Sequence, residues 1–197
     1  MRKLPVYFLI DVSESMAGDQ IREVENGIHY ILKELRGNPY ALETVYIGVI
    51  GFAGKAKTLV PLTELIQFNA PVLPLGSGTD LGAGLTELMK EMDASVQKTT
   101  PQKKGDWKPI VFLFTDGAPT HDPAKAVNRW SEHYRGHCAL TTIIFGDNAD
   151  VELLRLLGND VYRMTDLSRE SFREFFKWIS SSVGMSSMAV AQSHIHI

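Results

Sequence analysis

The sequence is short of several features that would assign a protein to a class at once. It has one cysteine, Cys138, so it cannot form an intramolecular disulfide, and we expect a reducing, cytoplasmic setting. It has no apolar run near the ~20 residues of a membrane-spanning helix, so we expect no membrane interaction. Its net charge of −3 gives no basic excess, which disfavours nucleic acid as a partner.

The basic start at residues 1–3 does not predict a secretory leader. The apolar stretch that follows contains Pro5 and is cut by Asp11. A signal peptide needs an apolar segment of about 7–15 residues and a cleavage site with small side chains. We therefore expect residues 4–12 to form a first strand instead.

Short apolar runs alternate with helical patterns along the chain. Strands are predicted at residues 4–12, 44–53, 55–62, 110–117, 138–146 and 160–165. Helices are predicted at residues 19–37, 81–98, 122–135, 150–158 and 168–183. The alternation predicts an α/β fold, a doubly wound three-layer α/β/α Rossmann-like sheet, mostly parallel, with residues 55–62 as one short edge strand.

The length of 197 residues suits a single domain, which we place at residues 1–184. Residues 185–197 are rich in serine and lack helical or strand periodicity, so we predict a disordered tail there. His194 and His196 lie in this tail at a spacing that could bind a stray metal, but the disordered tail is the preferred interpretation.

Two of the predicted parallel strands end in an acid. Asp11 follows the first apolar run and Asp116 follows the run at residues 110–115. The carboxyl ends of parallel strands share one edge of a sheet, where ligands bind near a topological switch point. Ser13 and Ser15 alternate with Asp11, and an extended chain would direct all three oxygens to one side. Thr79 lies between the two acids in the glycine-rich stretch GSGTDLGAG.

These five side chains offer hard oxygen ligands. The absence of histidine and cysteine among them disfavours zinc and copper, and Mg²⁺ fits best, with Mn²⁺ or Ca²⁺ as alternatives. The competing interpretation of Asp11, Ser13 and Ser15 is capping of the next helix. Asp80, beside Thr79, is interpreted as a helix cap rather than a ligand.

The three segments resemble the von Willebrand factor A domain family. DVSESM at residues 11–16 is similar to the DxSxS motif of that family, and Thr79 and Asp116 match the other two parts of its metal-ion-dependent adhesion site (MIDAS). The resemblance covers roughly residues 4–183. It implies hydroxyl ligands from Ser13, Ser15 and Thr79, with Asp11 and Asp116 binding directly or through water. It also implies a protein-interaction module rather than an enzyme, whose cation binds an acidic residue of a protein partner.

Within that family the chain resembles the bacterial TerY-like proteins of tellurium-resistance and chemical-stress clusters. The resemblance is carried by PVYFLIDVSESMAGDQI, GSGTDLGAGL, TDGAPTHDP and FFKWISSSV. It implies a cytoplasmic scaffold that works with a kinase and a PP2C-type phosphatase. The single cysteine cannot build the Cys₄ zinc module that some such proteins carry.

Two other functions stay open. An aspartate at the end of a first parallel strand also occurs in metal-dependent phosphohydrolases of the haloacid-dehalogenase type, but their second acid, two residues on, is Ser13 here. The stretch GSGTDLG also lacks the lysine of a phosphate-binding P-loop. The third possibility is a scaffold whose metal is purely structural.

Overall fold

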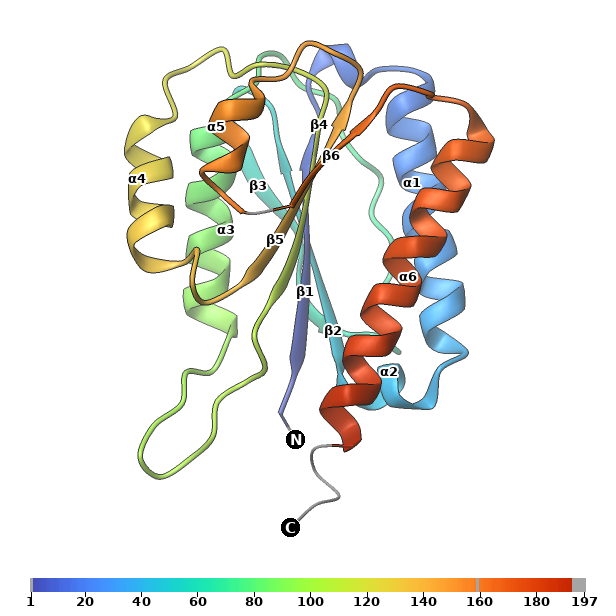
Figure 1. Ribbon diagram of the computed structural model, residues 1–197, viewed down its shortest axis with the longest axis vertical. Coiled ribbons are helices and arrows are strands. Elements are labelled where there is room, and N and C mark those ends of the chain that lie inside the picture. Colours follow the sequence, from blue (N-terminus) through green and yellow to red (C-terminus); the bar gives the residue numbers. More distant parts are fainter. Residues whose placement is uncertain (1, 159, 193–197) are drawn as a thin grey trace.

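Six strands form one sheet in the order β3-β2-β1-β4-β5-β6, with helices on both faces (Figure 1). The computed structural model describes residues 2–158 and 160–192. The strands are β1 (Leu4–Asp11), β2 (Val45–Phe52), β3 (Ala56–Glu64), β4 (Ile110–Thr115), β5 (Ala139–Phe145) and β6 (Asp160–Met164). The helices are the 3₁₀ turn η1 (Glu14–Met16), α1 (Asp19–Arg36), α2 (Pro39–Thr44), α3 (Leu81–Ser95), α4 (Ala124–His133), α5 (Val151–Arg155) and α6 (Arg169–Gln192).

The strand directions confirm the predicted fold class. All neighbouring strands pair in parallel except β3, which pairs antiparallel with β2 at one edge of the sheet. β1 starts beside the N-terminus and ends where η1 begins, so the carboxyl ends of the parallel strands gather at the η1 end of the molecule (Figure 1). The last turns of α6 lie at the opposite end, together with the start of β1 (Figure 1).

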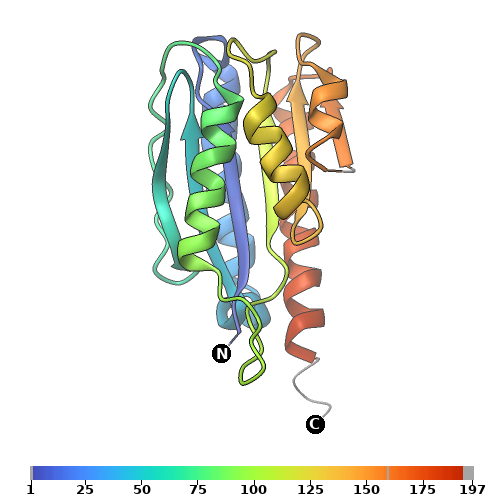
Figure 2. The same ribbon diagram turned by 90° about the vertical axis from the view of Figure 1, so that its left-hand side faces the viewer.

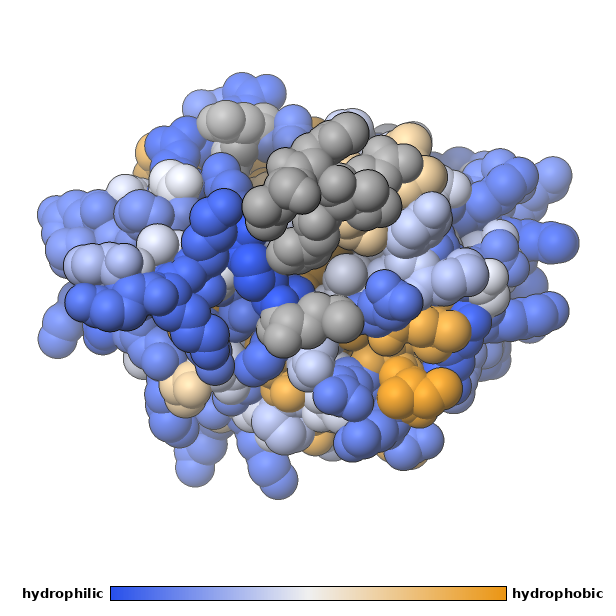
Figure 3. All heavy atoms as spheres, turned by 90° about the horizontal axis from the view of Figure 1, so that it is seen from below, coloured by the Kyte–Doolittle hydropathy of each residue, from blue (hydrophilic) through white to orange (hydrophobic). Residues whose placement is uncertain are grey.

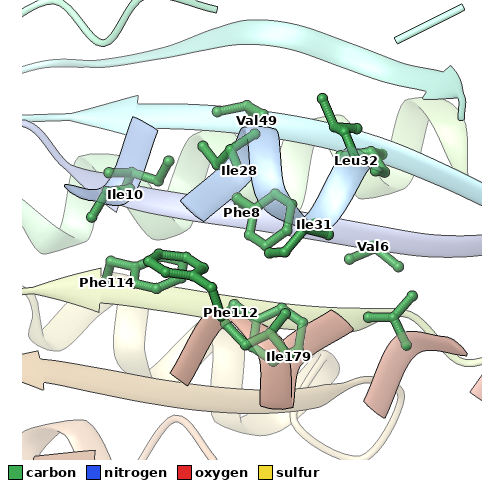
Figure 4. Packing of buried hydrophobic residues seen from close by; sticks show 14 of the residues in the cluster. Val6, Phe8, Ile10, Ile28, Ile31, Leu32, Val49, Phe112, Phe114 and Ile179 are labelled. Carbon is green, nitrogen blue, oxygen red and sulfur yellow. The ribbon is translucent and has the colours of Figure 1, made fainter. Parts of the chain in front are cut away.

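The core explains why the first strand is apolar without interruption. Every residue of β1 is buried, because helices cover both faces of the sheet. Val6, Phe8 and Ile10 pack toward α1 and α6 (Figure 4). Tyr7 and Leu9 point to the other face, which α3 and α4 cover side by side (Figure 2). Burial on both faces fixes β1 at the centre of the fold.

The division into a domain at 1–184 and a tail at 185–197 stays a prediction, but the structure differs from it in one respect. Helix α6 continues through residues 185–192, which we expected to be disordered. Ser187 and Val190 in that stretch are buried, and α6 packs against α1 and α2. Apolar contacts therefore stabilise turns whose serine-rich sequence gave no periodic signal. His194 and His196 lie outside the described residues.

The end of the molecule away from the strand carboxyl ends is mostly hydrophilic (Figure 3). Leu42 of α2 and Ile66 after β3 are exposed apolar side chains in the segments at this end. Among the helices of residues 2–158 and 160–192, none combines the length and the apolar character needed to cross a membrane.

Candidate metal centre

The candidate site lies where the chain reverses its path through the sheet. After β1 the chain adds β2 and β3 on one side, and it returns to place β4 on the other side of β1. Ile10 of β1 pairs with Phe114 of β4, so Asp11 and Thr115 come next to each other and Asp116 follows. The predicted meeting of the two acids at one edge of the sheet is therefore observed.

A chain of hydrogen bonds links four of the five predicted side chains. The Ser13 backbone N–H donates to Asp11 Oδ1 at 2.9 Å. The Ser13 and Ser15 hydroxyls are 3.0 Å apart, and the Ser15 hydroxyl donates to Asp116 Oδ1 at 2.7 Å. Two carboxylates and two hydroxyls from segments about a hundred residues apart thus form one polar cluster.

The local geometry corrects two expectations. Ser15 lies in the 3₁₀ turn η1 rather than in an extended chain, so a turn, not strand alternation, brings its hydroxyl back to the cluster. Neither serine caps a helix through its side chain: Ser13 makes no capping bond to η1, and Gly18 occupies the N-cap of α1. The capping interpretation of these serines is therefore wrong.

The loop that carries Thr79 is fastened to its neighbours by hydrogen bonds, but within residues 2–158 and 160–192 none of them joins Thr79 directly to the other four residues. The Thr79 N–H donates to Thr120 Oγ1 at 2.9 Å, and the Thr120 N–H donates to the Thr79 carbonyl at 2.8 Å. The Gly76 N–H donates to the Val12 carbonyl at 2.8 Å, which fastens the loop to the end of β1. Gly78 has a backbone φ of 78°, a conformation that residues other than glycine rarely adopt.

The acids of the cluster are buried, and neither forms an ion pair with any residue in the described ranges 2–158 and 160–192. Asp11 has no exposed surface, and Asp116 is 8% exposed. Burial raises the pKa of Asp11, and the charge of Asp116 raises it further, while hydrogen bonds from Ser13 and Thr115 lower it. Burial likewise raises the pKa of Asp116, against the hydrogen bond from Ser15. None of these influences is a cation, so two ionised carboxylates here cost free energy that a divalent ion would offset.

Sequence reasoning missed two residues that support the cluster. The buried Thr115 hydroxyl donates to Asp11 Oδ2 at 2.7 Å and so fixes the second oxygen of that carboxylate. Thr120 connects the loop after β4 to the loop of Thr79. Thr115 sits at the end of a strand beside Asp116, a signal that could have found it. Thr120 has no comparable signal in the sequence.

The neighbouring polar residues have other partners. Asp80 accepts a hydrogen bond from the Ala83 N–H at 2.8 Å and caps α3, as predicted. His121 is exposed, with its Nδ1 3.0 Å from the Thr120 hydroxyl. Glu14 is exposed and accepts from the Ser77 hydroxyl at 2.6 Å. In the part of the chain that is described, no three His, Cys, Asp or Glu side chains gather at one point, so hydroxyls distinguish this cluster from a zinc site rich in His or Cys.

A doubly wound sheet with carboxylates and hydroxyls at the ends of β1 and β4 is an arrangement of oxygen ligands suited to a cation. The family model of the von Willebrand factor type A domain matches residues 6–177. The chain belongs to this family. Domains of the family typically mediate metal-dependent protein interactions rather than catalysis.

Curated relatives are similar over the same region but are much longer. Inter-alpha-trypsin inhibitor heavy chain H6 of Homo sapiens is 25% identical over 160 residues, which cover 77% of this chain and 12% of that protein. Heavy chain H1 of Bos taurus is 25% identical over 158 residues, covering 77% and 17%. The chain thus spans less than a fifth of these relatives.

Solved structures share the fold at low sequence identity. A von Willebrand factor type A structure from Catenulispora acidiphila matches with a TM-score of 0.68 and 15% identity, covering 93% of this chain and 43% of that one. Proximal thread matrix protein 1 from the mussel byssus, with a zinc-occupied MIDAS motif, has a TM-score of 0.63 and 16% identity, covering 94% and 46%. Zinc is therefore known in the MIDAS of a protein with this fold, so donor type alone does not exclude zinc.

Proposed function

We propose that Asp11, Ser13, Ser15, Thr79 and Asp116 form a MIDAS that binds a divalent cation, with Mg²⁺ as the first candidate and Mn²⁺ or Ca²⁺ as alternatives. The observation that supports this most is the burial of Asp11 beside Asp116, with no basic partner for Asp11 among the described residues. Hydroxyl and carboxylate oxygens are ligands suited to such ions. When bound, the ion would supply a positive centre at the end of the molecule where η1 lies.

We infer that the module acts by binding an acidic residue of a protein partner at this ion. With only two carboxylates among the five ligands, the ion keeps affinity for a further negative oxygen. Ser15 is exposed whereas Asp11 and Ser13 are buried, so the cluster opens to solvent on the η1 side. A partner carboxylate can reach this side without a rearrangement of the core.

The setting we propose is a cytoplasmic tellurite or chemical-stress complex that includes a kinase and a PP2C-type phosphatase. The support is the likeness of four sequence segments to TerY-like proteins. Co-purification of this chain with either enzyme from its source cell, lost on adding EDTA, is the expected result. Recovery of neither enzyme in the presence of metal would contradict this setting.

Calorimetric titration and thermal melting with MgCl₂, MnCl₂, CaCl₂ and ZnCl₂ test the site itself. At a hundredfold excess of ion over Kd we expect a stabilisation of about 2.7 kcal/mol, or roughly 5–10 °C in Tm. The variant Asp11→Asn should lose this response. Asp80→Asn is the matched control, because an asparagine can still cap α3 and Asp80 is not a proposed ligand.

The same measurements separate an interaction module from the two alternatives. A purely structural metal would raise Tm without changing the affinity for a carboxylate-bearing partner. A phosphohydrolase would release phosphate from a generic phosphomonoester in the presence of Mg²⁺, an activity that Asp11→Asn should remove. We expect no such activity, because Ser13 replaces the second acid that such enzymes use.

A further inference from the structure

A pocket of about 660 Å³ opens beside the candidate metal centre, at the edge of the sheet that β3 forms. We call it the β3 pocket; its walls include Val12, Ala53, Lys55, Lys57, Leu59 and Leu75. The turn between β2 and β3 lies at the same end of the molecule as η1 (Figures 1 and 2).

The pocket adjoins the metal centre through wall residues that lie beside proposed ligands. Val12 lies between the proposed ligands Asp11 and Ser13 and also lines the pocket. Gly76, another wall residue, pairs with Ser13 in an isolated parallel bridge. The wall of the pocket therefore lies directly beside the segments that carry two of the proposed ligands, Asp11 and Ser13.

The walls are fixed rather than adjustable. The Gly54 N–H donates to the Ser77 carbonyl at 2.7 Å, which joins the β2–β3 turn to the loop that carries Thr79. A Cβ on Gly54 would come within 2.6 Å of that carbonyl, so only glycine permits this approach. The pocket is therefore preformed, and a ligand does not have to order these loops on binding.

The pocket combines apolar walls with positive charge at its rim. Leu75 is 50% exposed, so its apolar side chain is accessible to a ligand. Lys55 and Lys57 are exposed, and neither forms an ion pair with any residue of the described ranges 2–158 and 160–192. An apolar surface beside two free ammonium groups and a cation complements a ligand with both apolar and acidic groups.

We propose that the β3 pocket binds the partner segment that supplies the metal-binding acid. That segment is an extended peptide with one carboxylate for the ion, a large apolar side chain for the pocket and a second carboxylate for Lys55 and Lys57. An extended chain advances about 3.3 Å per residue, so these groups lie within a few residues of one another. The inference rests on the proposed function, since the first carboxylate needs the bound ion.

The test is a display library of peptides with one fixed aspartate and randomised flanks, selected on the full chain with MgCl₂. Metal-dependent peptides should be enriched in one large apolar residue and a second acid. Leu75→Ser should weaken a selected peptide about tenfold. Lys55→Ser with Lys57→Ser should weaken it about threefold, and this loss should shrink as salt is added.

Matched controls come from the same surface. Val72→Ser changes an exposed apolar residue, 83% exposed, on the segment that leads to Leu75 but outside the pocket. Lys103→Ser with Lys104→Ser makes the same charge change in the distant loop before β4. Neither control should change peptide affinity, and none of these variants should change Mg²⁺ binding measured by calorimetry.

The outcomes separate this inference from the proposed function. Metal-dependent peptides whose affinity is the same for the pocket variants and for the wild type would overturn the proposal that the pocket binds the partner segment. They would leave the proposed metal centre unaffected. A failure to select any peptide on protein that binds Mg²⁺ would also overturn the pocket. Loss of Mg²⁺ binding itself, with peptides that survive EDTA and Asp11→Asn, would instead overturn the proposed function.

Discussion

Asp11 is a buried acid, and its neutral analogue should stabilise the metal-free fold while removing metal binding. We expect Asp11→Asn to raise the free energy of unfolding of the metal-free protein at neutral pH by about 1–3 kcal/mol, because an uncompensated buried charge is removed. Urea unfolding in EDTA measures this.

The same substitution should abolish the rise in Tm that MgCl₂ produces in the wild-type chain. Ser186→Ala removes a hydroxyl on α6, far from the cluster, and is the control that should keep the rise in Tm. A metal-free Asp11→Asn protein that is less stable than wild type would show that the carboxylate is already compensated within the fold.

Thr115 acts on the site through Asp11, because its hydroxyl donates to Asp11 Oδ2. Thr115→Val keeps the shape and removes the bond, so we expect Mg²⁺ affinity to fall about tenfold. Calorimetric titration measures the change. Thr142→Val, at a buried threonine of β5, is the matched control and should leave Mg²⁺ affinity as it is. Equal Mg²⁺ affinities of the two variants would show that Thr115 does not support the metal centre.

For single residues, the sequence predicted the positions of the two acids better than those of the residues that hold the cluster together. Asp11 and Asp116 could be placed together because each ends a parallel strand, and strand ends share an edge. The turn at Ser15 could not be predicted, since period two in the sequence fits an extended chain equally well. Thr120 depends on contact between two loops 41 residues apart, for which the sequence carries no local pattern.

Among the elements, α1 and α6 cross at a glycine. A Cβ on Gly27 would lie 2.2 Å from the Phe176 ring. Gly→Ala in a helix usually stabilises by about 0.5–1 kcal/mol, but here overpacking should destabilise by about 1–3 kcal/mol. Chemical denaturation of Gly27→Ala measures whether the free energy of unfolding falls or rises. Asn26→Ala, at an exposed neighbouring position, is the control. A more stable Gly27→Ala protein would contradict the close crossing.

The last turns of α6 contribute to stability although their sequence is rich in serine. Removing residues 185–197 takes away the buried Val190 and Ser187, so we expect a loss of about 1–3 kcal/mol. A chain that ends at Gln192 is the control and keeps both residues. Equal melting temperatures of the two truncated chains would show that these turns do not stabilise the fold.

The elements that the sequence predicted are those with strong apolar periodicity, and the differences have local causes. The helix predicted at residues 19–37 ends before Asn38 and Pro39, and these two residues begin α2, which the sequence did not predict. The Asn38 side chain accepts from the Tyr40 and Ala41 N–H groups, and Pro39 takes the first helical position. The strand predicted at residues 55–62 extends to Glu64, and Pro61 lies within it because an edge position tolerates a missing N–H.

For the whole molecule, the raised pKa values of Asp11 and Asp116 predict how stability depends on pH without metal. Between the usual value of 3.8 and the raised pKa values, the native state holds protons that the unfolded chain releases. These acids therefore stabilise the metal-free fold below that range, and their contribution is lost as pH rises through it. Denaturation in EDTA at several pH values measures how the free energy of unfolding changes with pH.

Bound metal should reverse this dependence, because the ion requires ionised carboxylates. The rise in Tm produced by MgCl₂ should be full at neutral pH and shrink on acidification, starting above pH 3.8. Asp80→Asn should show the same profile as the wild type. A metal effect that is constant across this range would mean that the ion binds elsewhere.

The start of β1 and the end of α6 lie together, at the end of the molecule away from the candidate metal centre (Figure 1). A neighbouring domain, a fluorescent label or a sensor surface that is joined at the start of β1 or at the last turn of α6 is therefore attached at this end. The end with the candidate metal centre then faces away from that attachment. Attachment at the start of β1 or at the end of α6 therefore leaves the opposite end of the molecule, where η1 lies, accessible to a partner.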